Sequence, residues 1–316
     1  MLDLELYKKL YLIRQAEENI RKHYSEDEMK TPMHMSMGGE AIAVGVCHAL
    51  KPEDQVFGTY RSHAIYLAKT QNIDDFFAEI YGKDTAFLKG KGGSMHLCAP
   101  SAGFMETSAI VASNIPVAVG AAFANHRRGN GRLVTVFFGD GACDEGAFWE
   151  SLNIACLMKI PILFVCEDNG FAVHTPVSQR QGYKSITEII SRFNCNVFQD
   201  EPTDVEAIYN LTLKAIDLTN KTHIPSFLYL RYYRYLEHVG VNEDFDAGYR
   251  SREEFEKWYH LDQVNLQRKK LLQKGIEEAE LTAIEAEIKR HIENSMKSAK
   301  EAPFPETSEL LNGVFD

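Results

Sequence analysis

The feature that most constrains the fold is an alternation of short β-rich runs with longer helical patterns, which begins at Leu133. The strand-like runs are apolar and rich in β-branched and aromatic residues, whereas the segments between them have apolar residues at helical spacing. Such an order predicts right-handed βαβ crossovers, and hence an α/β fold with a parallel sheet flanked by helices. The predicted strands are 133–138, 161–166, 196–199 and 227–232, and the predicted helices are 145–158, 186–193 and 205–218.

Helical segments are also predicted on both sides of this alternation. At the N-terminus, residues 4–22 have apolar side chains at helical spacing. At the C-terminus, a stripe of apolar residues needs a surface to pack against; its members are Leu281, Ile284, Ile288, Ile292 and Met296. We therefore expect one α/β domain over residues 1–250, including the N-terminal helical segment, and a helical extension over residues 251–316 that packs against a partner.

The overall charge and the apolar runs limit the kinds of partner. The formal net charge of -11 at pH 7 argues against nucleic acid or an anionic membrane, because either would need a basic face. The longest apolar runs are too short to span a bilayer, and the charged start is no signal peptide. The six cysteines lie far apart and are interpreted as reduced, so a cytoplasmic location is expected.

Two polar motifs directly follow two of the predicted strands. Gly139-Asp140-Gly141 follows the first strand, and Asp168-Asn169-Gly170 follows the second. Because the carboxyl ends of parallel strands share one edge of the sheet, the two motifs should lie side by side. Glycines let the backbone approach a diphosphate, and carboxylate, amide and main-chain carbonyl oxygens are the ligands that Mg²⁺ prefers. A lone Gly-Asp-Gly also makes ordinary turns, but its place after a strand favours a diphosphate and magnesium site.

A glycine-rich segment lies between these motifs and the N-terminus. Residues 89–97 read Lys-Gly-Lys-Gly-Gly-Ser-Met-His-Leu and have neither helical nor strand periodicity. We expect a loop that runs close to a ligand or to another stretch of backbone, with a merely flexible loop as the alternative.

Several separate blocks give the chain a resemblance to a known family. They are Thr31-Pro-Met-His34 with Gly38-Gly-Glu40-Ala, Tyr60-Arg61-Ser-His63, Gly90-Lys-Gly-Gly-Ser-Met-His96, Gly139-Asp140-Gly141-Ala142, Glu167-Asp-Asn169-Gly-Phe171 and Tyr233-Arg234-Tyr-Leu-Glu-His238. In these blocks the sequence resembles the α subunits of thiamine-diphosphate-dependent 2-oxo acid dehydrogenase E1 components, which include pyruvate, branched-chain and acetoin dehydrogenases. The resemblance extends from about Leu4 to at least Trp258 and implies the thiamine-diphosphate-binding fold.

The resemblance also implies roles for individual residues. Mg²⁺ would be held by Asp140, Asn169 and the carbonyl of Phe171. The thiamine diphosphate would be contacted by Tyr60, Arg61, Ala109, Val111, Gly139, Asp140, Gly141, Ala142, Asn169 and His238. Three histidines would be catalytic: His34 would face the 2-oxo acid, His238 would lie near the diphosphate and the reacting centre, and His63 would be a further active-site histidine.

The implied activity is oxidative decarboxylation of a 2-oxo acid such as pyruvate, with transfer of the acyl group to a lipoyl group. Only one α/β domain is visible in the sequence, so the glutamate that activates the cofactor would come from a β-type subunit in an α₂β₂ heterotetramer. A lipoyl acyltransferase is a further expected partner. Glu40, the one glutamate of this chain in a suggestive block, is interpreted as structural.

Two other functions and two departures from the family pattern bear on this interpretation. A carboligase or transketolase-like enzyme would pass the carbanion to an aldehyde or keto sugar instead. A non-enzymatic Rossmann-like regulator is disfavoured, because no Gly-x-Gly-x-x-Gly fingerprint or Walker loop is present.

The chain has Asp168-Asn169 where the family usually has Asn-Asn, which changes local charge but keeps the metal position. It has Gly38-Gly39-Glu40 where the family usually has Gly-Gln-Glu.

Overall fold

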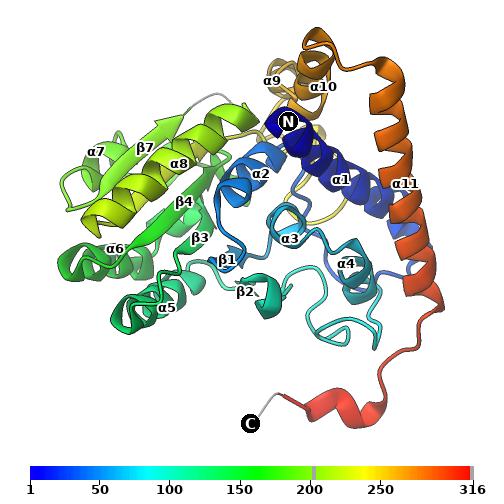
Figure 1. The fold of residues 1–316 in the computed structure, drawn as a ribbon, viewed down its shortest axis with the longest axis horizontal. Helices are drawn as coiled ribbons and strands as arrows, with labels where there is room; N and C mark the ends of the chain where they lie inside the picture. The colour runs from blue at the N-terminus through cyan, green and yellow to red at the C-terminus, as the bar shows by residue number, and fades with distance from the viewer. Residues whose placement is uncertain (201–203, 314–316) are drawn as a thin grey trace.

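The computed structural model describes residues 1–200 and 204–313 and has a six-stranded parallel sheet at its centre (Figure 1). The strand order is β2-β1-β3-β4-β8-β7, and every neighbouring pair is parallel. The strands are β1 (Gln55–Thr59), β2 (Phe104–Ser108), β3 (Val134–Gly139), β4 (Ile162–Asp168), β7 (Asn196–Asp200) and β8 (Ser226–Arg231). The predicted α/β fold with a parallel sheet flanked by helices is therefore confirmed.

Helices cover both faces of the sheet and bury two separate apolar cores. Along β4, Leu163 points into one core and Phe164 into the other, as the two-residue side-chain period of a strand requires. The first core is covered by α2 (Glu40–Ala49), α3 (His63–Thr70), α4 (Ile73–Ile80) and α8 (Val205–Thr222). The second is covered by α5 (Asn114–Arg128), α6 (Gly146–Met158) and α7 (Ile186–Ile190).

The C-terminal extension folds back onto the N-terminal helix of the same chain (Figure 1). It consists of α9 (Arg252–Tyr259), α10 (Gln263–Gln273) and α11 (Glu278–Glu301), and α11 runs along α1 (Leu2–His23) and α4. The predicted apolar stripe buries Leu281, Ile292 and Met296 in the first core, while Ile284 and Ile288 are partly buried. The stripe thus finds its packing surface within this chain, and packing of the extension against a partner subunit stays a prediction.

The polar groups between α1 and the extension show why the two pack together. The hydroxyl of Tyr7 donates to Glu285 at 2.6 Å, and the side-chain amide of Gln267 donates to the carbonyl of Asp3 at 3.1 Å. Arg14 on α1 is buried between Glu40 and Asp262, with contacts of 2.6 and 2.7 Å. These pairs tie α1, α2 and the start of α10 together.

The six cysteines are all free, and four of them are buried. Among the described residues no helix has the length and apolarity that crossing a bilayer requires.

Candidate active site

The carboxyl ends of β1, β2, β3, β4 and β8 meet around one cavity of about 260 Å³. This is the edge of a parallel sheet at which ligands bind, because loops from several strands converge there. Most of the residues implied by the family resemblance line it: Tyr60, Arg61, Val111, Gly139, Asp140, Gly141, Ala142, Asn169, Phe171 and His238. The cavity lining therefore brings together residues that lie as far apart in sequence as β1 and the loop after β8.

Asp140 begins a short 3-10 turn, Asp140–Asp144, directly after β3. The residue is 3 % exposed, and its Oδ1 atom is buried with no hydrogen-bond partner among the described residues. Its Oδ2 atom accepts a hydrogen bond from Arg180. Burial, together with the nearby carboxylate of Asp168, raises the pKa of Asp140 to about 6. An acceptor left unpartnered in a buried site is costly unless a ligand uses it.

Asn169 and Phe171 lie beside Asp140, at the start of a two-stranded hairpin of β5 (Phe171–Ala172) and β6 (Thr175–Pro176). The side-chain oxygen of Asn169 accepts from the backbone N–H of Phe171 at 3.0 Å, and its amide donates to the hydroxyl of Tyr232 at 3.2 Å. Asp168, by contrast, accepts from the N–H of Gly170 at 2.8 Å and so shapes the turn. The amide of Asn169 is thus oriented by both neighbours.

The described residues contain no cluster of three or more His, Cys, Asp or Glu side chains able to hold a metal ion. A cation at Asp140 would therefore need ligands of other kinds, namely amide and carbonyl oxygens and a ligand's own oxygens. That is the coordination expected for Mg²⁺ when it bridges a protein to phosphate groups. Gly141 permits a close approach here, because a Cβ at this position would lie 3.0 Å from the Cβ of Ala172.

Two arginines fix the protonation of His238. Arg61 and Arg234 both donate to its Nδ1 atom, each at 3.2 Å, and Arg61 also donates to the carbonyls of Met35 and His238. Because guanidinium groups only donate, Nδ1 must accept and the ring proton must sit on Nε2. Burial and the two guanidinium groups lower the pKa of His238 to about 3, so the ring is neutral at pH 7.

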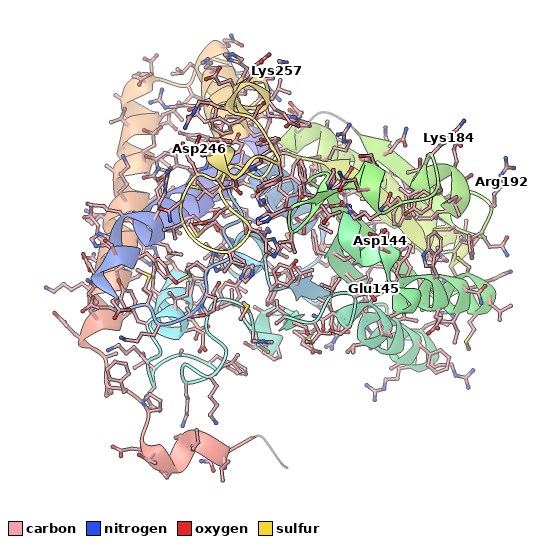
Figure 2. All side chains as sticks on the ribbon, turned by 180° about the vertical axis from the view of Figure 1, so that it is seen from behind. Asp144, Glu145, Lys184, Arg192, Asp246 and Lys257 are labelled. Atoms are coloured by element: carbon pink, nitrogen blue, oxygen red, sulfur yellow. The ribbon has the colours of Figure 1, made fainter. Side chains whose placement is uncertain are left out.

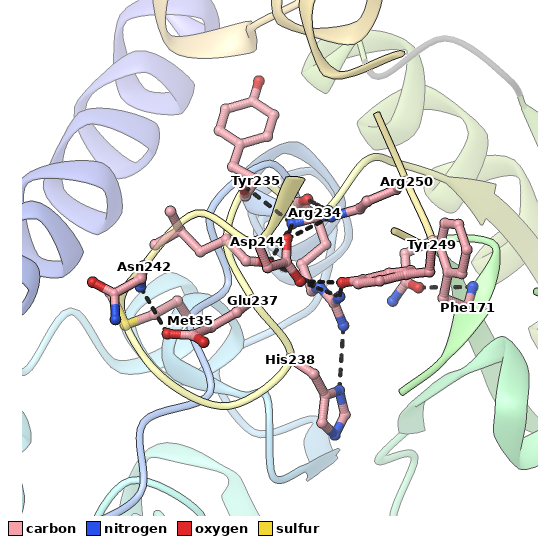
Figure 3. A network of polar contacts seen from close by, with 12 residues as sticks. Met35, Phe171, Arg234, Tyr235, Glu237, His238, Asn242, Asp244, Tyr249 and Arg250 are labelled. Carbon is pink, nitrogen blue, oxygen red and sulfur yellow. Dashed lines mark hydrogen bonds and ion pairs between the residues drawn. The ribbon is translucent and has the colours of Figure 1, made fainter. Parts of the chain in front are cut away.

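The loop that carries His238 is closed by its own polar network (Figure 3). Arg250 is buried, donates to Asp244 at 2.7 Å and to the carbonyl of Leu236 at 2.8 Å, and Asp244 also accepts from the hydroxyl of Tyr249. Tyr249 accepts in turn from Arg234 at 2.5 Å. Sequence reasoning placed Arg234 in a family-like block but gave it no role. The structure places it between His238 and the network that closes the loop.

His34 packs against the cavity residues Tyr60 and His238, with ring-centre separations of 4.6 and 5.5 Å. Its Nδ1 atom is buried and has no hydrogen-bond partner among the described residues. Burial, and then the charges of Arg61 and His63, lower the pKa of His34 to about 3. The side chain is therefore a neutral imidazole with an unused polar atom beside the cavity.

His63 lies elsewhere, in the interior of the chain. It is fully buried, its Nδ1 is 3.0 Å from the carboxylate of Glu17, and its Nε2 is 2.6 Å from the hydroxyl of Ser94. It is not part of the cavity lining, and neither is Ala109, whose neighbours Ile110 and Val111 are. Both ring nitrogens of His63 have partners, so the described contacts give this histidine a structural role, and the catalytic one stays a prediction.

The glycine-rich segment runs close to other parts of the same chain. The N–H groups of Gly90, Gly92 and Gly93 donate to the buried carboxylate of Glu79, at 3.1, 2.7 and 2.9 Å. A Cβ on Gly90 would lie 2.5 Å from the backbone of Gly82, so a side chain has no room there. Of the two expectations, a ligand or another backbone, the structure shows the second. The concave set of N–H groups that such loops offer to anions is occupied by Glu79.

Glu167 is a cavity residue that sequence reasoning left without a role. It lies one residue before the end of β4, opposite Gly139, and is near Arg61. Burial raises its pKa to about 8, so at pH 7 it is mostly neutral. The cavity wall around Arg61 therefore carries less negative charge than its residue types indicate, which suits an anionic ligand.

The cavity as a whole fits a diphosphate bound with a hard cation. It offers the unpartnered oxygen of Asp140, the close backbone at Gly141 and the donors of Arg61 and His238.

Nearly the whole chain is similar to known proteins. Residues 8–308 match the family model described as dehydrogenase E1 component. The α subunit of the acetoin:2,6-dichlorophenolindophenol oxidoreductase of Bacillus subtilis is 31 % identical, over 99 % of this chain and 93 % of the relative. The pyruvate dehydrogenase E1 component α subunits of Zymomonas mobilis and Rhizobium meliloti are each 32 % identical, over 98 % and 99 % of this chain and 88 % and 89 % of those relatives.

Proposed function

The chain belongs to the dehydrogenase E1 component family, whose members depend on thiamine diphosphate, and from this premise we propose that its cavity binds thiamine diphosphate with Mg²⁺. It is an α subunit of a 2-oxo acid dehydrogenase. The single observation that carries the cofactor proposal is the buried, unpartnered Oδ1 atom of Asp140 in a cavity that is also lined by the donors Arg61 and His238.

The family resemblance supplies the proposed ligands, and all of them except Ala109 line the cavity. Mg²⁺ would be held by Asp140, Asn169 and the carbonyl of Phe171. Arg61 offers forked donors that match phosphate oxygens, and His238 offers its Nε2–H. Val111 and Ala109, in the loop after β2, would contact the aminopyrimidine. When bound, thiamine diphosphate supplies the electron sink for decarboxylation.

The chain's own histidines would act as neutral hydrogen-bond donors. With a pKa of about 3, neither His34 nor His238 can serve as a cationic acid near pH 7. Such a group can still stabilise a developing negative charge on the substrate oxygen, as a preorganised donor in a site shielded from water. We propose that His34 does so, because its free Nδ1 atom lies beside Tyr60 and His238.

The activating glutamate is proposed to come from a β-type subunit. Glu40 cannot supply it, since Arg14 and the N–H of Gly38 hold its carboxylate at 2.6 and 2.8 Å. In an α₂β₂ assembly, an α subunit and a β subunit would then both contribute residues to each site. The acyl group would pass to the lipoyl group of an acyltransferase. Exposed apolar side chains on α5 and α6 support an interface there; the most exposed are Val117, Phe123, Ile154, Leu157 and Met158, at 46, 39, 45, 75 and 46 %.

Reconstitution tests this function. The chain co-expressed with its β-type partner should release CO₂ from pyruvate or a branched-chain 2-oxo acid with an artificial electron acceptor, and only with thiamine diphosphate and Mg²⁺ present. The chain alone should be inactive. Robust turnover by the chain alone would contradict the shared site, and product formation only when an aldehyde is added would indicate a carboligase instead.

A further inference from the structure

Arg180 is a half-buried cation next to Asp140. The β5–β6 hairpin and a 3-10 turn, Val177–Gln179, lead the chain from Phe171 back towards the end of β3, and Arg180 ends that turn. Its side chain is 11 % exposed. The strap from Phe171 to Arg180 thus carries the expected carbonyl ligand at one end and a guanidinium group at the other.

Each nitrogen of the Arg180 guanidinium group donates to a different acceptor. Its Nη2 donates to Asp140, its Nη1 donates to Asp144 at 2.5 Å, and its Nε donates to the carbonyl of Thr175 at 3.3 Å. Asp144 is more open to solvent than Asp140, with 27 % of its side chain exposed against 4 %, and it also accepts from Gln181 at 3.1 Å. Arg180 can therefore leave Asp140 and still keep Asp144 and Thr175.

We propose that Arg180 competes with the divalent cation for Asp140 and so sets the affinity of this site for the metal. The inference rests on the proposed function, in which Asp140 is a metal ligand. Arg180 occupies one oxygen of Asp140, so a divalent cation on the other oxygen would meet a carboxylate whose negative charge is shared, and the two positive charges repel where screening is weak. Metal binding therefore includes either this repulsion or the cost of moving Arg180 onto Asp144.

Removal of the competitor should tighten metal binding. The test measures Mn²⁺ affinity by electron paramagnetic resonance, in the assembled enzyme with saturating thiamine diphosphate. Arg180→Ala should bind Mn²⁺ roughly ten- to a hundredfold more tightly than the natural chain, the range that one hydrogen bond to a charged group represents. Arg180→Gln, which keeps most of the side chain's packing, should show the same direction.

The matched control is Arg192→Ala. Arg192 is exposed and lies at the outer edge of the molecule, whereas Asp144 lies at the start of α6 (Figure 2). Its removal changes the net charge equally and should leave Mn²⁺ affinity unchanged. Arg180→Lys should fall between the natural chain and Arg180→Ala, because an ammonium group keeps the charge but lacks the fork that spans both carboxylates.

Each other outcome overturns the proposal in a recognisable way. Equal Mn²⁺ affinity in Arg180→Ala, Arg180→Gln and the natural chain would show that Arg180 does not compete. Weaker Mn²⁺ binding together with weaker thiamine diphosphate binding would make Arg180 a diphosphate ligand instead. If the natural assembled enzyme bound no Mn²⁺ in the presence of thiamine diphosphate, the proposed function itself would fail, and the competition with it.

Discussion

Burial sets the charge states of individual residues in this cavity. Two arginines approach His238 from the Nδ1 side, and burial and the charge of Arg61 act on His34, so both imidazoles stay neutral. Asp140 and Glu167 both have raised pKa values for the same reason. The site therefore combines permanent positive charge on arginines with neutral donors, an arrangement that favours anionic ligands.

His34 is predicted to affect turnover and not cofactor binding. In the assembled enzyme, His34→Ala should lower the turnover number by roughly a hundredfold, the loss expected for one donor to a developing oxyanion. The affinity for thiamine diphosphate should change little, because Arg61 and Asp140 remain. His260→Ala, an exposed histidine on the C-terminal extension, serves as the control. Unchanged turnover with every accepted 2-oxo acid would show that His34 has a structural role and no catalytic one.

The lowered pKa of His34 predicts how the stability of the folded chain depends on pH. The folded pKa of His34 is about 3 and the ordinary value is 6.5, so between these pH values the unfolded chain binds a proton that the folded chain does not. Stability should fall as pH falls below about 6.5 and be unaffected above it. His34→Gln should reduce the loss of unfolding free energy between pH 7 and pH 5 by about 1 to 2 kcal/mol. Urea titrations at both pH values measure this, and an identical loss in both proteins would contradict it.

The sequence predicted the residues of the site only where they follow a readable pattern. Asp140 and Asn169 follow apolar runs that are unmistakable as buried strands, and the family blocks added Arg61 and His238. Arg180 could not be predicted in this way, because its contact with Asp140 spans 40 positions and depends on the path of an irregular strap. Arg234 and Glu167 were visible in blocks, but their roles depend on burial and on neighbours that only the fold supplies.

At the scale of elements, four of the six strands of the sheet were predictable and the other two were not. β3, β4, β7 and β8 appear within one or two residues of their predicted positions, because β3 and β4 are continuous apolar runs and the alternation with helical patterns locates β7 and β8. β1 and β2 are short and include Gly58 and the exposed Glu106, so neither reads as a buried strand. The helix predicted over 186–193 ends at Ile190, where the hydroxyl of Ser191 donates back to the carbonyl of Glu188.

Glu79 is predicted to hold the glycine-rich loop in place. Glu79→Gln replaces one of two acceptor oxygens with an NH₂ group, which cannot accept from the N–H groups of Gly90, Gly92 and Gly93. The cost should be about 1 to 3 kcal/mol and should be local. Hydrogen exchange should then become faster in residues 89–94, whereas Glu106→Gln should leave these amides unchanged. Equal exchange in both variants would show that His63 and Thr31 suffice to hold the loop.

At the scale of the whole molecule, the chain is one α/β sheet with its helical extensions packed on one side and its cavity at the carboxyl edge. The extension from α9 to α11 is held by α1 and α4, so it completes the first core of this chain. Residues from five strand ends then converge on the cavity without any contribution from the extension.

Calorimetric titration of thiamine diphosphate with Mg²⁺ into the assembled enzyme tests most directly whether this cavity is the cofactor site. The natural protein and the Asp246→Ala control, which alters an exposed carboxylate, should bind with equal affinity. Asp140→Ala should bind at least about a hundredfold more weakly while unfolding at the same temperature or higher, since the buried carboxylate costs the folded chain free energy. Near-normal affinity in folded Asp140→Ala would contradict the assignment of this cavity as the cofactor site.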